Sequence, residues 1–297
     1  MHILLTGASS FLGRSIVPQL ALAGHRIYAV WHAHKANYKQ DQCRFPQIDL
    51  IQADLSDIEV YATFPDRIDA IIHIAAVSSK VHSIYEFIQN NVTGMKNLIE
   101  YALNKKVNYL IYLSSLSIHG RIEDTVVTEK TPIINPDMYG MSKYIAELLL
   151  CEKAININSI AIRLPGVLGI GAHRHWLSTV FTRAKNGDDI LIFNPDAPFN
   201  NAVHVEDLAE FINNLLERKW HGFHVMPLGA GGLTTIKEAV ERIILKTEST
   251  SRVIIKREDK SSFIISSHYA KDTFQYTPMN INEMIDKYVD ENIFMNS

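Results

Sequence analysis

Two residues of the sequence, Tyr139 and Lys143, are spaced so that they could share a proton transfer. They stand four positions apart in Tyr-Gly-Met-Ser-Lys, at the start of a segment with helical periodicity. In a helix this spacing places both side chains on one face, one turn apart. A free tyrosine has a pKa of about 10, too high for an efficient acid or base at neutral pH. A neighbouring lysine cation favours the phenolate and lowers that pKa.

A hydroxyl group that could steady a reacting oxygen lies upstream of this pair. Directly after the apolar run 109–113 comes the segment Ser114-Ser115-Leu116-Ser117-Ile118-His119-Gly120. A donor placed where negative charge develops stabilises the transition state of a carbonyl reaction. Tyr-x-x-x-Lys alone also fits an exposed helix start. Because the pair follows a serine at the end of an expected strand, a catalytic role is favoured. We therefore expect hydride transfer at a hydroxyl or keto carbon.

A glycine turn near the N-terminus could hold the phosphates of a nicotinamide cofactor. The segment Thr6-Gly7-Ala8-Ser9-Ser10-Phe11-Leu12-Gly13 follows an apolar run and opens an amphipathic one. Gly7 allows a tight turn, Gly13 lets helix approach strand, and the N–H groups of the helix start attract a pyrophosphate. The hydroxyls of Ser9 and Ser10 could also reach phosphate. The pattern alone is weak, because Ser10 stands where a middle glycine is expected.

The end of the second expected strand bears on the choice of cofactor. A carboxylate there would bind the ribose 2′-OH of NAD and repel the 2′-phosphate of NADP. This strand ends in Trp31 and His32, followed by Lys35, with no Asp or Glu among them. We therefore favour NADP(H), with NAD(H) as the alternative. A solvated loop around Lys35 is the other interpretation.

Composition predicts a soluble protein with a large core. The chain has 297 residues, 47% hydrophobic and 21% charged, and a net charge of −3. That charge gives no attraction to nucleic acid or to an anionic membrane. We find no apolar run long enough to span a bilayer and no secretion signal, so a cytoplasmic location is expected. The two cysteines have no metal-ligand spacing, and no metal site is expected.

Short apolar runs alternate with helical patterns in the first half, which predicts βαβ units. Strands are expected at 3–5, 27–31, 48–52, 70–74, 109–113 and 159–163, and helices at about 11–23, 84–104, 138–154 and 204–216. Later segments predict a strand from 222, a helix near Thr234 with a capping box of Thr235 and Glu238, a strand at 253–255 and a terminal helix.

The expected fold class is α/β, a Rossmann-type doubly wound parallel sheet with a smaller C-terminal α/β substrate lobe. Residues 1–165, with about 203–220, would form the dinucleotide-binding domain. Residues 166–202 and 221–297 would form the substrate-binding lobe. The substrate is expected in the cleft between them, beyond the carboxyl ends of the strands.

Taken in order along the chain, these features resemble the extended short-chain dehydrogenases/reductases. This group contains nucleotide-sugar epimerases, dehydratases and reductases, and the match covers essentially the whole chain. The segments that carry it are 6–13, 53–55, 73–76, 91–98, 114–120, 139–143, 163–169 and 203–207. Their combination and order are highly specific, although no single motif is.

The resemblance implies a catalytic set of Ser115, Tyr139 and Lys143. Ser115 is preferred over Ser114 because it stands five residues before Gly120. The expected cofactor contacts are Gly7, Ser9, Ser10, Phe11, Leu12, Gly13, Trp31, His32, Lys35, Asp54, Leu55, Ala75, Ala76, Tyr139, Lys143, Pro165, Gly166 and Val167. Within this set the resemblance puts Asp54 and Leu55 at the adenine, Ala75 and Ala76 along the ribose and phosphates, and 165–167 near the nicotinamide. Asn91 is expected to fix backbone inside the fold.

Substrate contacts are expected at Val77, Ser78 and Ser115, and in a loop that contains His173 and Arg174. Arg174 could bind a phosphate, and a plain surface loop is an equal alternative. His-x-His at 173–175 lacks a third ligand nearby in sequence. His204, before an acidic helix start, is interpreted as structural.

Two departures from the family pattern leave details of the site open. His119 stands where many relatives have tyrosine. Gly166 replaces an asparagine that often contacts nucleotide-sugar substrates, so that substrate class is less secure.

Acids that are missing at two places in the sequence narrow the reaction. The family pattern places the acid that selects NAD at Trp31, and 4,6-dehydratases carry an Asp-Glu pair at the positions of Leu116 and Ser117. We therefore expect an NADPH-dependent reduction of a keto group, at the 4-keto position of a nucleotide-linked deoxysugar. The alternatives are an NAD-retaining nucleotide-sugar epimerase and, from another class, a non-catalytic NAD(P)-sensing protein. We expect a small-molecule substrate and no nucleic-acid or membrane partner. We also expect a homodimer that forms through 84–104 and 138–154.

Overall fold

The computed structural model describes residues 1–33, 45–78, 82–173, 175–256 and 262–294. The chain divides into two compact units. The first comprises Met1–Arg121, Ile133–Arg163 and Ala209–Met226, and the second comprises Ile122–Pro132, Leu164–Leu208 and Pro227–Ser297. The units differ from the expected domains in that 122–132, 164–165 and 203–208 fall in the second unit and 221–226 in the first. The functional names given to the domains remain a proposal.

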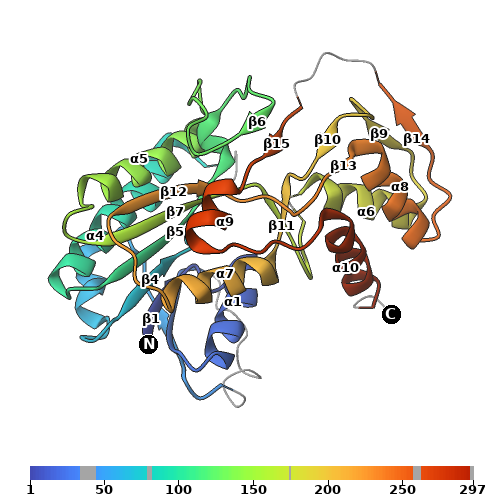
Figure 1. Ribbon diagram of the computed structural model, residues 1–297. Helices are drawn as coiled ribbons and strands as arrows, with labels where there is room; N and C mark the ends of the chain where they lie inside the picture. Colours follow the sequence, from blue (N-terminus) through green and yellow to red (C-terminus); the bar gives the residue numbers. More distant parts are fainter. Residues whose placement is uncertain (34–44, 79–81, 174, 257–261, 295–297) are drawn as a thin grey trace. The chain divides into compact units, whose positions relative to one another are not determined.

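The first unit is built on one sheet, drawn with its helices in Figure 1. The described residues form seven strands in the order β12-β7-β5-β4-β1-β2-β3. Their bounds are β1 His2–Thr6, β2 Arg26–Trp31, β3 Ile48–Gln52, β4 Ala70–His73, β5 Tyr109–Ser115, β7 Asn158–Leu164 and β12 Phe223–Pro227. β1 pairs in parallel with both β2 and β4, β2 with β3, and β4 with β5. The predicted doubly wound α/β fold is thereby confirmed, with β4 ending one residue earlier than expected.

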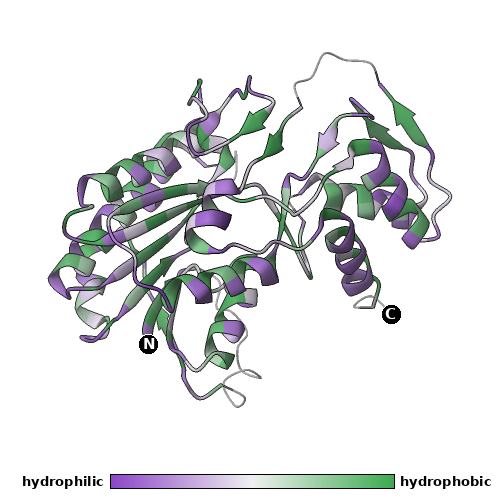
Figure 2. Cartoon of the chain, in the orientation of Figure 1, coloured by the Kyte–Doolittle hydropathy of each residue, from purple (hydrophilic) through white to green (hydrophobic). Residues whose placement is uncertain are grey.

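The strands are apolar because both faces of the sheet are covered. Ile3, Leu4 and Leu5 of β1 are all fully buried, so consecutive side chains on opposite faces are both shielded from water. Figure 2 shows this as hydrophobic strands between helices whose hydropathy changes around their circumference. Helices α4 (Gly94–Asn104) and α5 (Met138–Glu152) cover one face, and α1 (Phe11–Leu22) and α7 (Val205–Leu216) cover the other (Figure 1).

The helix expected at 84–104 forms in three parts. A short helix α3 (Ile84–Phe87) begins at a capping box of Ser83 and Glu86, and continues through a π-helical segment η2 (Ile88–Thr93) into α4. π-Helical turns inside α-helices are frequent at functional sites. Here the segment contains Asn91, which is buried.

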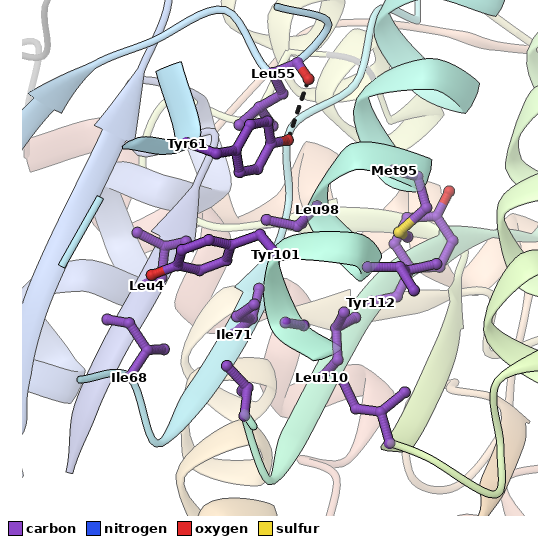
Figure 3. Close-up of a cluster of buried hydrophobic side chains, with 14 of the residues drawn as sticks. Leu4, Leu55, Tyr61, Ile68, Ile71, Met95, Leu98, Tyr101, Leu110 and Tyr112 are labelled. Atoms are coloured by element: carbon purple, nitrogen blue, oxygen red, sulfur yellow. Dashed lines mark hydrogen bonds between the residues drawn. The ribbon is translucent and has the colours of Figure 1, made fainter. Parts of the chain in front are cut away.

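A cluster of apolar and aromatic side chains fixes α4 on the sheet (Figure 3). Tyr61, in the 3-10 helix η1 (Ile58–Thr63), donates its hydroxyl hydrogen to Leu55 O at 3.1 Å and Gly94 O at 3.2 Å. Burial raises the pKa of Tyr61, so the hydroxyl stays protonated as a donor. A side chain at Gly94 would lie 3.3 Å from Leu55 Cβ, which leaves little room for a larger residue. The start of α4 is therefore tied to the turn after β3.

The described part of the second unit contains pairs of short strands and several helices. Its strand pairs are β6 (Val126–Val127) with β15 (Ile264–Ile265), β8 (Gly166–Leu168) with β11 (Ala202–His204), β9 (Ile190–Ile192) with β14 (Val253–Ile255), and β10 (Pro198–Phe199) with β13 (Thr234–Thr235). Its helices are α6 (Trp176–Asn186), α8 (Ile236–Lys246), α9 (His268–Phe274) and α10 (Ile281–Phe294). The predicted capping box of Thr235 and Glu238 is present at the start of α8. Within the described ranges, no helix is both long and apolar enough to cross a membrane.

Candidate active site

The glycine turn lies between β1 and α1 and has the geometry of a phosphate cradle. Gly7 has a φ of +76°, and a Cβ there would lie 2.6 Å from Ala75 N. A Cβ at Gly13 would lie 2.3 Å from Gly7 O, so only glycine allows the helix to approach the strand this closely. The first turn of α1 contains no acidic residue. Its N–H groups and positive dipole end are therefore not neutralised by the helix's own side chains.

Ser10, at the position of the expected middle glycine, caps α1. Its Oγ accepts a hydrogen bond from Gly13 N at 3.0 Å. The hydroxyl thus satisfies a backbone donor of the helix and keeps its own hydrogen as a donor, so its contact with phosphate stays a prediction. The departure from the glycine pattern thus has a local structural reason.

A buried row of side chains runs from the glycine turn towards Lys143. Thr6 Oγ1 lies 2.7 Å from His73 Nδ1, and the His73 ring stacks on Tyr112 with centroids 5.5 Å apart. Lys143 Nζ lies 4.5 Å from the centroid of the Tyr112 ring. Burial, with the nearby charge of Lys143, lowers the pKa of His73 to about 3, so this imidazole is neutral at pH 7.

Lys143 is held inside the first unit at the carboxyl end of the sheet. Only 2% of the residue is exposed, and Nζ donates to Leu113 O at 2.7 Å. Burial lowers its pKa to about 7, and the carboxylate of Glu147 opposes that shift. At neutral pH the ammonium group is therefore near its titration midpoint, where a charged or polar ligand can change its protonation.

The two serines at the end of β5 have different surroundings. Ser114 is buried and its Oγ donates to Glu147 Oε1 at 2.5 Å. Ser115 is half-buried; its Oγ accepts from Ser117 N and donates to Ser117 Oγ, both at 3.1 Å. Ser115 also caps the 3-10 helix η3 (Leu116–His119). The Ser114 hydroxyl is bound to the Glu147 carboxylate, whereas the Ser115 hydroxyl is more accessible. This difference favours Ser115 as the proposed donor.

Tyr139 lies half-buried in the first turn of α5, which packs against the end of β5. A Cβ at Gly140 would lie 2.1 Å from Ser117 O, so glycine is needed where the helix meets η3. Asp137 begins the helix by accepting a hydrogen bond from Gly140 N at 2.8 Å. These contacts bring the start of α5 beside the strand that ends in Ser115.

Asn91 connects the loop after β4 to α5, as the resemblance implied. Its Oδ1 accepts from Val77 N at 2.9 Å, and its Nδ2 donates to Val77 O at 3.0 Å and to Ser142 Oγ at 2.9 Å. Ser142 in turn donates to Tyr139 O at 2.8 Å. The π-helical segment thus positions the first turn of α5. Ser78, Ala75 and Ala76 lie on the same loop, with Ala76 exposed and the other two half-buried.

The residues expected around the adenosine lie at the ends of β2 and β3. His32 Nε2 is 3.6 Å from Asp54 Oδ2, and both side chains are largely exposed. Asp54 Oδ1 accepts hydrogen bonds from Ser56 N at 2.9 Å and Ser56 Oγ at 2.8 Å, which fixes the carboxylate. Trp31 is half-buried at the end of β2. Lys35 lies outside the described residues.

The remaining expected contacts belong to the second unit. Pro165, Gly166 and Val167 lead into and form β8, which pairs in parallel with β11. His173 is exposed, with Nδ1 3.1 Å from Gly171 O, and Arg174 lies outside the described residues. His175 caps α6 by accepting from Leu177 N at 3.0 Å.

The structure also contains polar residues that sequence reasoning missed. Glu147 and Arg163 form a buried ion pair with Nη2 and Oε2 2.7 Å apart, and Ser114 binds the same carboxylate. His73 and Tyr112 lie between the glycine turn and Lys143. Glu147 stands four residues after Lys143, so its place on the same helix face was a usable clue. The position of Arg163 opposite it depends on the order of strands in the sheet.

Comparisons with known proteins identify a matching family and similar chains. The model of the family described as "NAD dependent epimerase/dehydratase family" matches residues 3–226. The chain is 26% identical over 230 residues to UDP-glucose 4-epimerase of Lactobacillus helveticus, covering 71% of this chain and 68% of that protein.

Two solved structures share the fold. UDP-glucose 4-epimerase of Thermotoga maritima with UDP-glucose superposes with a TM-score of 0.81 at 20% identity, covering 100% of both chains. dTDP-glucose 4,6-dehydratase of Bacillus anthracis in complex with NAD gives a TM-score of 0.81 at 20% identity, covering 98% of this chain and 96% of that one. Proteins with different reactions thus share this architecture.

Proposed function

Because the chain belongs to the NAD dependent epimerase/dehydratase family, and is an NAD(P)-dependent enzyme of the extended short-chain dehydrogenase/reductase type, we propose that it reduces the 4-keto group of a nucleotide-linked deoxysugar with NADPH. One observation carries the choice of cofactor. β2 ends in Trp31 with the exposed imidazole of His32 beyond it, and residues 26–33 contain no carboxylate. A 2′-phosphate would therefore meet no carboxylate from this strand.

The residues of the first unit fit a dinucleotide. The N-terminus of α1, with the closely packed Gly7 and Gly13, would hold the pyrophosphate, and Asp54 would meet the adenine. Lys143 would hydrogen-bond the nicotinamide ribose. A bound nicotinamide would supply or accept the hydride.

The chain's own part in the reaction is to handle the proton and the oxygen. Tyr139 would donate its phenolic proton to the substrate oxygen as that oxygen gains negative charge. The Ser115 hydroxyl would donate a hydrogen bond to the same oxygen and lower the energy of the transition state. Lys143 as a cation would stabilise the phenolate that Tyr139 leaves behind.

Epimerisation is the second candidate, because the similar proteins named above include UDP-glucose 4-epimerases. It would use the same three residues, first to oxidise and then to reduce one carbon, with the cofactor retained between the two steps. Dehydration is disfavoured, since Leu116 and Ser117 provide no acid next to Ser115.

The test is a panel of nucleotide sugars and 4-keto nucleotide sugars incubated with NADPH or NADH. Absorbance of the reduced cofactor is followed, and the sugar products are separated. We expect net NADPH oxidation with a keto-sugar, and at least about a 100-fold loss of kcat in Tyr139→Phe because the general acid is removed. Tyr144→Phe, one turn further along α5, is the matched control and should keep its kcat.

Two outcomes would contradict this proposal. A tightly retained NAD in the purified protein, with sugars that change configuration but no net NADPH oxidation, would establish epimerisation instead. An unchanged kcat in Tyr139→Phe would remove Tyr139 from the reaction altogether.

A further inference from the structure

A buried ion pair lies one helical turn beyond the proposed catalytic lysine. Arg163, 5% exposed, and Glu147, 2% exposed, face each other in the first unit. Arg163 Nη2 donates to Glu147 Oε2 at 2.7 Å, and Nε lies 3.2 Å from Oε1 and 3.3 Å from Oε2. Ser114 Oγ donates a hydrogen bond to Glu147 Oε1 at 2.5 Å. The desolvation of a buried ion pair offsets much of its attraction, so stability alone is a poor reason for its presence.

The three residues of this cluster each adjoin a part of the proposed site. Glu147 follows Lys143 by one turn of α5, so the two side chains share a helix face. Ser114 precedes Ser115 at the end of β5. Arg163 stands near the end of β7, directly before the segment 164–167. One carboxylate therefore ties together the ends of β5 and β7 and the helix that carries Tyr139 and Lys143.

The Glu147 carboxylate affects whether Lys143 is protonated, because the other described groups around this lysine carry no charge that would stabilise its cation. The groups that interact with Lys143 are Tyr112 and the Leu113 carbonyl from β5, His73 from β4, and Glu147 from α5. Tyr139, one turn before Lys143 on α5, interacts with Tyr112. Burial holds the pKa of His73 low and that of Tyr112 high, so both are neutral at pH 7. Among these groups, Glu147 is the carboxylate that offsets the cost of burying the ammonium group.

We infer that Glu147 is a positioning residue of the reaction: held by Arg163 and Ser114, it keeps Lys143 in its cationic form beside Tyr139. This inference rests on the proposed function for the role of Lys143. Arg163 and Ser114 both donate hydrogen bonds to the Glu147 carboxylate and fix its position. The negative charge of Glu147 therefore stays on the face of α5 that carries Lys143. Without the carboxylate, Lys143 would lose the charge that opposes the effect of burial on its pKa, and the buried cation of Arg163 would lose this ion pair; both changes favour a neutral lysine.

The first experiment measures the pH dependence of kcat in Glu147→Gln. Activity needs the lysine cation and falls as Lys143 loses its proton, so the alkaline limb of the profile should move to lower pH by about one unit or more. At the pH optimum of the wild type, kcat should fall about tenfold, while KM for the sugar stays within about threefold. Glu152→Gln, an exposed glutamate on the same helix that pairs with Lys153, is the matched control and should leave the limb in place.

A second measurement does not need a substrate. The titration of Lys143 can be followed by NMR of lysines labelled at Cε, with the resonance assigned by its loss in Lys143→Arg. In Glu147→Gln the midpoint should fall by the same amount as the kinetic limb. A midpoint and a limb that both match the wild type would overturn the inference.

A double variant separates charge from folding. Glu147→Gln/Arg163→Met removes both charges of the ion pair and should place the midpoint between those of Glu147→Gln and the wild type, because the repulsion from Arg163 is gone. A midpoint in the double variant equal to that of Glu147→Gln would show that the charge of Arg163 has no effect of its own on Lys143, and would overturn that part of the inference. If Tyr139→Phe is fully active while the Lys143 midpoint moves as expected, the proposed function fails and the electrostatic role of Glu147 stands.

Discussion

Burial shifts the pKa values of individual side chains in the first unit far from their values in water. His73 and Lys143 are both almost completely buried, and burial lowers the pKa of each, to about 3 and about 7. His73 is neutral across the physiological range, so it can bind Thr6 without adding charge beside the lysine. The chemical character of the site therefore depends on burial as much as on residue type.

His73 should make the protein sensitive to acid. Its pKa is lower in the folded protein than the usual 6.5, so the unfolded chain binds more protons between about 6.5 and about 3. Its stabilising contribution is complete above that window and is lost as the pH falls through it, with a slope of up to about 1.4 kcal/mol per pH unit. In His73→Gln, the free energy of unfolding in urea should fall less between pH 7 and pH 5 than in the wild type.

The control for this prediction is His32→Gln, which removes an exposed histidine and should keep the wild-type slope. An equal slope in His73→Gln and the wild type would show that other groups cause the acid sensitivity.

At the scale of elements, short contacts between backbones and small residues decide where helices begin. Gly13 lets α1 approach β1, Gly140 lets α5 approach η3, and Gly166 receives the ring of His175. In the second unit, a Cβ at Gly166 would lie 1.9 Å from His175 Cδ2. His175 also caps α6 and has its Nε2 3.0 Å from Asn201 O, next to β11. The glycine found in place of the family's asparagine thus makes room for a histidine that joins α6 to the strand pair β8–β11.

Gly166→Ala should therefore destabilise the protein by about 1–3 kcal/mol, because the new methyl group displaces the buried ring of His175. His175→Ala should cost at least about 1 kcal/mol through loss of the helix cap. In the double variant the methyl group has space, so the combined cost should be smaller than the sum by about 1 kcal/mol or more. Urea unfolding of the four proteins measures this coupling, and simple additivity would contradict the contact.

At the scale of the whole molecule, the first unit has an apolar surface on α3, η2 and α5. The exposed residues that form it are Ile84, Tyr85, Ile88, Met138, Met141 and Leu148, and α3 packs directly against α5. We propose that a second copy of the chain covers this surface, as expected from the sequence for 84–104 and 138–154. Such a patch, if left in water, would favour association.

The homodimer predicts a mass of about twice 33.6 kDa by light scattering after gel filtration. Ile84→Glu/Leu148→Glu should shift the protein to a monomer, because two charges would be desolvated in the interface. Ile155→Glu, at a residue 98% exposed beyond the end of α5, is the control and should remain a dimer. A wild-type protein of monomer mass would refute the proposal.

Much of the first unit follows from local sequence patterns. Apolar runs of three to five residues, alternating with amphipathic segments, predicted β1, β2, β3, β4, β5 and β7 and the helices between them. Periodicity and turn chemistry are local properties, and the capping box of Thr235 and Glu238 was readable for the same reason. The proton-handling pair could be proposed because its two members lie on a single helical turn.

What the sequence by itself determined is therefore the class of fold, the family and the candidate residues Ser115, Tyr139 and Lys143. Only the tertiary structure decided which partners surround them. Glu147 meets Arg163 and Ser114 because β5 and β7 are neighbours in the sheet and α5 covers that face, a relation between segments up to 49 positions apart. Burial, and with it the protonation of His73 and Lys143, likewise depends on how distant segments pack, because no local pattern specifies the surroundings of a side chain.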